Sequence, residues 1–191
     1  MSSLQRYKKS GGFFQLLSLI ETFGPQKKEK FLEMIETESP VWAQALREKM
    51  LTVERIFSWP DQVILEVFKQ MQPKSMAFAL EGLKDEQKER VTVFLSHAEK
   101  RRLSDVLTES KPKPEEISAT LVKLVEIARR MLQERELHAE KFDDKLLIPE
   151  DYENRLEERT ANTFAHGKNA DEMIKCPSGG SQREQRSADD S

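Results

Sequence analysis

The sequence predicts an all-α protein, and three observations support that prediction. Apolar residues recur at steps of three and four along most of the chain, which is the spacing of one helix face. The 191 residues include only seven glycines, too few for a turn-rich all-β fold. Most of the eight prolines stand between the periodic segments, where a helix ends or begins. Charged residues make up 34% of the chain, as expected for helices with solvated outer faces.

Residues 13–50 are predicted to form the first helical unit. Residues 1–12 are expected to be a flexible N-terminus that ends in the joint Ser10-Gly11-Gly12. Gly24-Pro25 ends the first helix, and Ser39 is placed to cap a third helix that starts at Pro40. The apolar stripes of the three predicted helices are Phe13, Leu16, Leu17 and Ile20, then Phe31, Met34 and Ile35, then Trp42, Ala45, Leu46 and Met50.

Residues 51–138 are predicted to form a second helical subdomain. Its expected helices are Val63–Met71, Pro73–Gly82, a helix from Asp85, His97–Glu109 and, longest of all, Pro114–Leu137. Residues 139–159 are expected to be a partly ordered extension, in which Phe142, Leu146, Leu147 and Ile148 fold back onto the bundle and a short charged helix follows. The polar residues 160–191 are predicted to be a disordered tail.

A weak internal repeat suggests how these helices stack. The segment Ile20–Phe31 lines up with Leu80–Val91, and charges of the same sign coincide at several positions. Stacked helical units of about 40 residues, as in armadillo-like arrays, would produce this similarity. The general composition of charged helices would produce it nearly as often, so it is only mild support for armadillo-like units.

Composition and motifs argue against several classes of function. Net charge is −3 with both signs interspersed, which predicts no nucleic-acid partner. The lone cysteine, Cys176, favours a reducing compartment, and no apolar run reaches the roughly 20 residues of a membrane span. His97, His138 and His166 have no metal-ligand spacing, and no phosphate-binding glycine loop is present. We therefore expect a cytoplasmic protein that is not an enzyme, with no catalytic residue, metal, cofactor or small-molecule substrate.

Two surfaces remain as candidates for function. Residues 13–50 are rich in aromatic side chains, which predicts either packing on the following helices or a partner-docking face. The residues of that predicted docking face are Phe13, Phe31, Met34, Trp42 and Leu46. The outer face of the helix from Pro114 is the second candidate, with a solvated face as the simpler interpretation; its charges are Lys123, Glu126, Arg129, Arg130 and Glu134.

Several short motifs occur in a recognisable order between residues 10 and 137. They are Ser10-Gly-Gly12, Ser39-Pro-Val-Trp-Ala-Gln-Ala-Leu-Arg47, Met50-Leu-Thr-Val53, Ala79-Leu-Glu-Gly82, Leu103-Ser-Asp-Val-Leu107 and Ile127-Ala-Arg-Arg130. This series resembles the C-terminal region of the flagellar motor-switch protein FliG. In that family the corresponding slots carry a Gly-Gly linker, an armadillo helix, a Met-Phe-x-Phe hinge, an Ala-Leu-Lys-Gly turn and a Leu-Arg-Asp-Asp-Leu helix end.

The resemblance implies a truncated, divergent relative with an armadillo-like unit, a hinge at Met50, Leu51, Thr52 and Val53, and a C-terminal helical subdomain. It also implies a stator-facing ridge of charges. The ridge positions here are Glu81, Lys100, Arg101, Asp105 and Lys113. Glu81 stands where the family has lysine, and Val106 replaces the second aspartate, so the ridge departs from the family pattern.

Two hypotheses follow from the resemblance. The first is a non-enzymatic rotor component or accessory subunit in motility and chemotaxis. Its expected partners are a full-length flagellar rotor or switch protein and, as a second candidate, the cytoplasmic loop of the stator. Its expected place is the cytoplasm, peripheral to the inner membrane at the flagellar basal body. The second is a helical-repeat adaptor or regulatory module outside the flagellum that kept only the fold.

Overall fold

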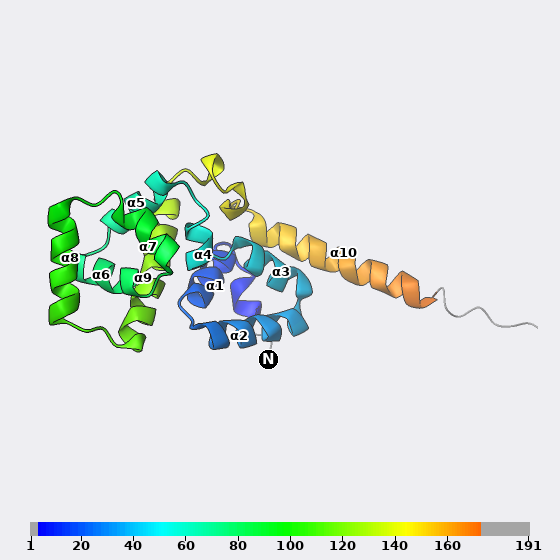
Figure 1. The fold of residues 1–191 in the computed structure, drawn as a ribbon. Helices are drawn as coiled ribbons and strands as arrows, with labels where there is room; N and C mark the ends of the chain where they lie inside the picture. The colour runs from blue at the N-terminus through cyan, green and yellow to red at the C-terminus, as the bar shows by residue number, and fades with distance from the viewer. Residues whose placement is uncertain (1–3, 173–191) are drawn as a thin grey trace, which may run out of the picture.

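The computed structural model describes residues 4–172, with side chains described for residues 4–162. Every regular element in that range is a helix, so the predicted all-α class is confirmed. Figure 1 shows two groups of helices side by side and a last helix that leads away from them. Each group has its own hydrophobic core.

The N-terminal unit consists of three α-helices and a preceding 3₁₀ turn, and the first turns of the last helix pack against them. Its elements are η1 (Gln5–Tyr7), α1 (Gly12–Glu21), α2 (Pro25–Glu38), α3 (Pro40–Lys49) and the start of α10 (Tyr152–Glu172). The largest side chains of its core are Phe13, Leu16, Leu17, Ile20, Leu32, Ile35, Trp42 and Leu46. These residues are the apolar stripes of three amphipathic helices turned toward one another.

The C-terminal unit surrounds α9. Its elements are α4 (Val53–Ile56), α5 (Asp61–Lys69), α6 (Pro73–Glu81), α7 (Asp85–Thr92), α8 (His97–Glu109), α9 (Pro114–Gln133), η2 (Ala139–Lys141) and η3 (Asp144–Leu146). Helix α9 packs against α4, α5 and α6, and it also contacts α1 of the N-terminal unit. One long helix therefore belongs to the second core and touches the first.

Local sequence signals account for most helix starts. Pro25, Pro40, Pro73 and Pro114 are the first residues of α2, α3, α6 and α9, where a missing N–H costs no hydrogen bond. Helix α8 begins after Ser96, whose hydroxyl accepts a hydrogen bond from the Glu99 N–H. The Glu99 carboxylate in turn accepts a hydrogen bond from the Ser96 N–H, which completes a capping box.

The contact between α6 and α9 depends on a glycine. A Cβ added at Gly82 would lie 2.4 Å from Cγ2 of Ile117 and 3.2 Å from Cδ1 of Leu121. Only a residue without a side chain allows the end of α6 to approach α9 this closely. Gly82 thus leaves room for the side chains of Ile117 and Leu121 against the end of α6.

Three expectations about the chain outside the main helices are corrected. Residues 1–12 were expected to be flexible, but from residue 4 onward they pack on the N-terminal unit, because Leu4 and Tyr7 are buried in its core. The short helix α4 was not predicted, and it follows directly on the expected hinge. Helix α10 continues through Glu172, so residues 160–172 are helical; the rest of the predicted disordered tail, residues 173–191, lies outside the described residues.

Candidate functional site

The structure corrects the predicted partner-docking face. Phe13, Trp42 and Leu46 are each 0% exposed, so a partner cannot touch them. Phe13 packs against the Trp42 ring at a centroid distance of 5.8 Å. Of the five residues predicted for this face, only Phe31 and Met34 reach the surface, and Met34 is 46% exposed. The alternative interpretation, packing within the chain, therefore holds for the three buried residues.

Helix α10 covers the part of the N-terminal unit that the sequence left open to docking. Tyr152 packs edge-on against the Phe13 ring, with centroids 4.8 Å apart. Glu153 accepts a hydrogen bond from the Phe13 N–H at 3.0 Å. It thereby pairs one of the N–H groups in the first turn of α1, which have no acceptor within the helix. Leu156 is fully buried in the same core.

The next acidic residue of α10 adds a polar contact at the edge of this cover. Glu157 accepts a hydrogen bond from Nε1 of Trp42 at 3.2 Å and pairs with Nζ of Lys8 at 3.0 Å. Segments near the two ends of the described chain thus complete one unit. Periodicity alone does not reveal this contact, because it does not say which distant segment covers an apolar face.

The exposed apolar surface that remains on the three helices of this unit lies on the outer side of α2. Met34 stands exposed there, and Phe31 is half-buried with its ring 5.5 Å from that of Phe23, edge to face. Lys27 lies over the Phe23 ring at 4.1 Å. The outer side of α2 therefore combines exposed apolar atoms with a cation. It is the part of the predicted docking face that remains open to a partner.

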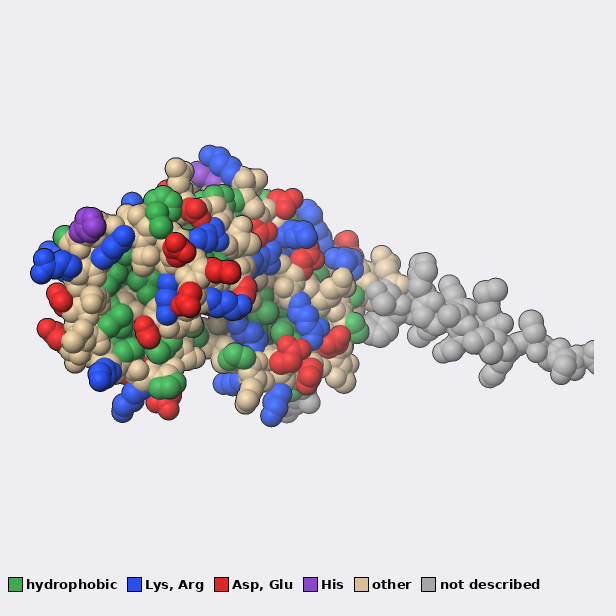
Figure 2. Space-filling view, viewed as in Figure 1, with side chains coloured by type: hydrophobic (Ala, Val, Ile, Leu, Met, Phe, Trp, Pro, Cys, Tyr) green, Lys and Arg blue, Asp and Glu red, His purple; other side chains and the backbone are tan. Residues whose placement is uncertain are grey.

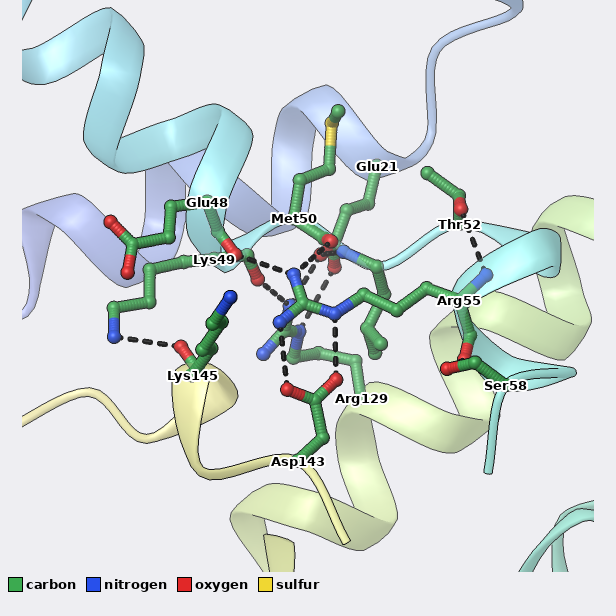
Figure 3. A network of polar contacts seen from close by, with 11 residues as sticks. Glu21, Glu48, Lys49, Met50, Thr52, Arg55, Ser58, Arg129, Asp143 and Lys145 are labelled. Carbon is green, nitrogen blue, oxygen red and sulfur yellow. Dashed lines mark hydrogen bonds and ion pairs between the residues drawn. The ribbon is translucent and has the colours of Figure 1, made fainter. Parts of the chain in front are cut away.

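The predicted hinge, Met50 to Val53, joins α3 to α4 and is held by a buried ion pair (Figure 3). The Glu21 carboxylate of α1 accepts a hydrogen bond from the Leu51 N–H at 2.7 Å. It also pairs with the Arg129 guanidinium of α9, through contacts of 2.5 and 3.0 Å. Arg129 donates a further hydrogen bond to the carbonyl of Lys49 at 2.8 Å. A carboxylate and a guanidinium thus fix the backbone on either side of Met50.

A second guanidinium holds the same segment from the other side. Arg55 donates to the carbonyl oxygens of Glu48 and Met50 and forms a two-point pair with Asp143, at 2.7 and 2.9 Å. Hydrogen bonds from Arg55 hold the pKa of Asp143 below its usual value. Figure 3 shows both arginines converging on the segment from Glu48 to Met50.

Two further side chains complete the surroundings of the hinge. Nζ of Lys49 donates to the carbonyl of Lys145 at 2.7 Å, and burial lowers the pKa of Lys49. Thr52 caps α4 by accepting a hydrogen bond from the Arg55 N–H. The four predicted hinge residues therefore lie at the boundary between the units, in a segment whose backbone has side-chain partners.

All five predicted ridge residues are exposed, but they do not form one cluster. Glu81 of α6 and Lys100 of α8 line the same groove of about 380 Å³, together with Lys88 of α7. Its apolar walls are Leu80, Leu95, Leu103 and Leu107. Figure 2 shows apolar side chains gathered between α7 and α8 on the viewed face.

The other three ridge positions lie outside this groove. Arg101 and Asp105 stand on the exposed face of α8, and Lys113 precedes α9, where its N–H donates to Glu116 at 2.9 Å. The groove between α6, α7 and α8, with Glu81 and Lys100 on its rim, is thus the part of the ridge that offers both charge and apolar contact.

One polar residue of the site was misplaced by the sequence analysis. Arg129 was assigned to the solvated outer face of the long helix, yet it is 5% exposed. A signal for its burial was present, because Val125 lies four residues before it and Leu132 three residues after it, both in the predicted apolar stripe. The buried partner, Glu21, had a weaker signal, since it follows the last apolar residue of α1.

Two negative findings apply to the described part of the chain. Among residues 4–162, no group of three or more His, Cys, Asp or Glu side chains is placed to hold a metal ion. No helix between residues 4 and 172 is long and apolar enough to cross a bilayer. Cys176 lies beyond this range, and the side chain of His166 is not described.

Comparison with known proteins supports the resemblance. A family model described as the FliG C-terminal domain matches residues 33–138, from within α2 to the residue before η2. The flagellar motor switch protein FliG of Aquifex aeolicus is 31% identical over 120 residues, which cover 61% of this chain and 36% of the relative. That of Thermotoga maritima is 24% identical over 132 residues, covering 69% and 39%.

A solved structure of full-length FliG from Aquifex aeolicus is also similar, with a TM-score of 0.42 and 29% identity over 66% of this chain and 40% of that one. The chain thus spans less than two-fifths of the length of the two curated relatives. Because the family model covers more than half of the chain, the protein belongs to the FliG C-terminal domain family.

Proposed function

We propose that this protein is a non-enzymatic component of the flagellar rotor, which acts through protein–protein contacts in motility. The family match over residues 33–138 is the observation that carries this proposal. Relatives that share this region are flagellar motor switch proteins by name. A place in the cytoplasm, peripheral at the flagellar basal body, is part of the same proposal.

The outer side of α2 is the proposed docking face toward a full-length switch protein. Met34 and Phe31 supply apolar contact there, and Met34 is one of the few large apolar side chains that the described surface exposes by more than a third. Phe13, Trp42 and Leu46 act indirectly, because they shape the core that positions α2. Helix-on-helix contact of this kind needs a shaped apolar face rather than a strong charge.

The groove between α6, α7 and α8 is the proposed second contact, toward the cytoplasmic loop of the stator. Exposed charges mainly change the rate at which two proteins associate. The sign of the charge at position 81 should therefore affect the association rate more than the area of the final contact. With an acidic Glu81 beside Lys100, the rim carries mixed charge. We infer that any contact with the stator here is weaker than one made by a relative with a lysine at this position.

A binding titration against a purified full-length switch protein from the same organism tests the docking proposal. The wild-type chain is expected to bind saturably, and Met34→Asp is expected to weaken binding at least about tenfold, which corresponds to about 1.4 kcal/mol. Leu147→Asp is the matched control, because Leu147 is likewise exposed, at 40%, and follows η3 instead of belonging to α2. Helical content measured by circular dichroism should be equal in all three proteins.

Two results would contradict the proposal. One is no binding up to high micromolar concentrations, which would favour an adaptor that kept the fold for another assembly. The other is an equal loss of binding in the Met34 and Leu147 variants, which would show that α2 is not the docking face. Trp42→Asp is unsuitable as a test, because a charge at this buried position would unfold the unit itself.

A further inference from the structure

A second groove lies on the C-terminal unit, on the side of α8 that faces α5. It has a volume of about 570 Å³ and is bounded by α5, the start of α6, the turn between α7 and α8, and α8 itself. Its apolar lining is Leu65, Phe68, Met71, Pro73, Met76, Phe94, Leu95 and Leu103. Glu81 and Lys100, the ridge residues of the first groove, do not line it.

An exposed aromatic side chain stands at the edge of this groove. Phe94 is 52% exposed, although most other phenylalanines of the described chain are buried or half-buried. The turn that carries it is held by hydrogen bonds from the N–H groups of Phe94 and Leu95 to the carbonyls of Val91 and Thr92. These hydrogen bonds fix the backbone of the turn that places Phe94 at the surface. Its exposed ring is available as an anchor for a partner.

The charged residues on the rim of the groove give it a net positive charge. Lys69 and Arg102 are exposed, and both lie near enough to Glu99, the carboxylate on the same rim, to act on it electrostatically. The acidic residue on the rim, Glu99, is already engaged, since its carboxylate accepts hydrogen bonds from the N–H and the hydroxyl of Ser96 at 2.8 and 2.6 Å. These hydrogen bonds leave the charge of Glu99 in place. Two cations and one carboxylate give the rim one net positive charge, which favours acidic side chains on a ligand.

We propose that this groove binds an amphipathic helix of a protein partner, with acidic residues flanking the apolar face of that helix. A concave apolar floor fits the ridge of a helix, and the thioethers of Met71 and Met76 can adapt to its side chains. Carboxylates beside the ridge would meet Lys69 and Arg102. The groove shares Leu95 and Leu103 with the ridge groove but none of that groove's charged residues, and the proposal does not rest on the docking face on α2.

Selection from a display library of helical peptides tests this inference on the full chain. The library fixes leucine and phenylalanine along one face and varies the flanking positions between glutamate and lysine. Peptides with glutamate flanks should be enriched, and Phe94→Asp should weaken binding of the selected peptides at least about tenfold. Val93→Asp is the matched control, because Val93 is 63% exposed and does not line the groove.

Charge reversal supplies a second, independent readout. The double variant Lys69→Glu/Arg102→Glu should lose the glutamate-flanked peptides and select lysine-flanked ones instead. Because both side chains are exposed, the variant is expected to fold normally. Enrichment of lysine flanks by the wild-type chain, no enrichment at all, or equal weakening by the Phe94 and Val93 variants would overturn the proposal. Binding to anionic lipid vesicles without peptide selection would overturn it in favour of a membrane surface.

Discussion

Glu21 and Arg129 form an ion pair that is almost completely withdrawn from water. Their closest N–O distance is 2.5 Å, and their side chains are 2% and 6% exposed. The pair joins α1 of the N-terminal unit to α9 of the C-terminal unit. Each member also binds the backbone next to the hinge, Glu21 at the Leu51 N–H and Arg129 at the Lys49 carbonyl. The relative position of the two units is therefore fixed through the same atoms that fix the hinge.

Removing one member of this pair should destabilise the protein strongly. Arg129→Met leaves the Glu21 carboxylate buried without its counter-charge, and the expected cost is about 3–5 kcal/mol in the free energy of unfolding. The double variant Glu21→Gln/Arg129→Met should cost less than Arg129→Met alone, because no charge is then left buried. Urea unfolding measures both. Arg130→Met is the control, since Arg130 is exposed; equal losses at positions 129 and 130 would show that the pair has no special role.

Acid should weaken the contact between Arg55 and Asp143. The pKa of Asp143 is lower in the folded protein than in the unfolded chain, because Arg55 hydrogen bonds favour the carboxylate. The pair therefore contributes its full stability above the unfolded value of about 3.9, and that contribution is lost as pH falls through the lower, folded pKa. Asp143→Asn is expected to cost about 1.5–3 kcal/mol at pH 7 and to flatten the stability curve below about pH 4.

The measurement is urea unfolding of wild type and Asp143→Asn at a series of pH values. Asp144→Asn changes the neighbouring exposed carboxylate and serves as the control. Parallel curves for wild type and Asp143→Asn would mean that the acid sensitivity arises elsewhere.

Helix α10 should act as part of the N-terminal core rather than as an appendage. Leu156→Ala removes a fully buried side chain, and the expected cost is about 2–5 kcal/mol. Trp42 lies in that core and Trp59 in the other, so fluorescence in a Trp59→Phe background follows the N-terminal unit by itself. The midpoint of urea unfolding should fall with Leu156→Ala and stay nearly constant with Leu147→Ala, whose side chain is 40% exposed. An unchanged midpoint in both would show that α10 does not support this unit.

Gly82→Ala should disturb the contact between α6 and α9. The added methyl would lie 2.4 Å from Cγ2 of Ile117, so either the Ile117 side chain or one of the two helices must shift, at a cost of about 1–3 kcal/mol. Ile117→Ala in the same chain should recover part of that loss, because it removes the obstructing atoms. Gly24→Ala is the control, since no atom lies within 4 Å of its added Cβ. The absence of any rescue by Ile117→Ala, measured by thermal unfolding, would contradict the steric explanation.

Glu81→Lys should strengthen any contact between the ridge groove and the stator loop. Glu81 is exposed, so the fold should be unaffected to within about 0.5 kcal/mol. Association with a purified cytoplasmic fragment of the stator should become about 3–10 times tighter, and the gain should shrink as salt screens the charge. Glu140→Lys gives the same change in net charge away from the groove. An equal gain in both variants would assign the effect to net charge alone.

Helix positions in this chain follow from local chemistry and were predictable. His97–Glu109 was predicted from its apolar spacing and is the observed extent of α8, and the prolines that open α2, α3, α6 and α9 mark their starts. The short helix α4 was missed, because four residues show no period. Periodicity is a property of neighbouring residues, so it fixes helices of two turns or more and little else.

The candidate surfaces were less predictable, because exposure depends on segments far apart in the chain. An apolar stripe containing Phe13 and Trp42 shows that something must cover it, but not whether that cover is a partner or the chain itself. The structure supplies Tyr152 and Leu156 of α10 as the cover and leaves Met34 and Phe94 exposed. In the same way, the sequence shows that residue 129 is charged, but not whether its side chain faces water or is buried beside Glu21. The amino-acid sequence was enough to predict the class of fold, the longer helices and the family. It did not predict α4, and Ser39, which was expected to cap α3, makes no side-chain hydrogen bond there. Tertiary packing decided which faces are free, because the burial of a face depends on the segment that packs against it.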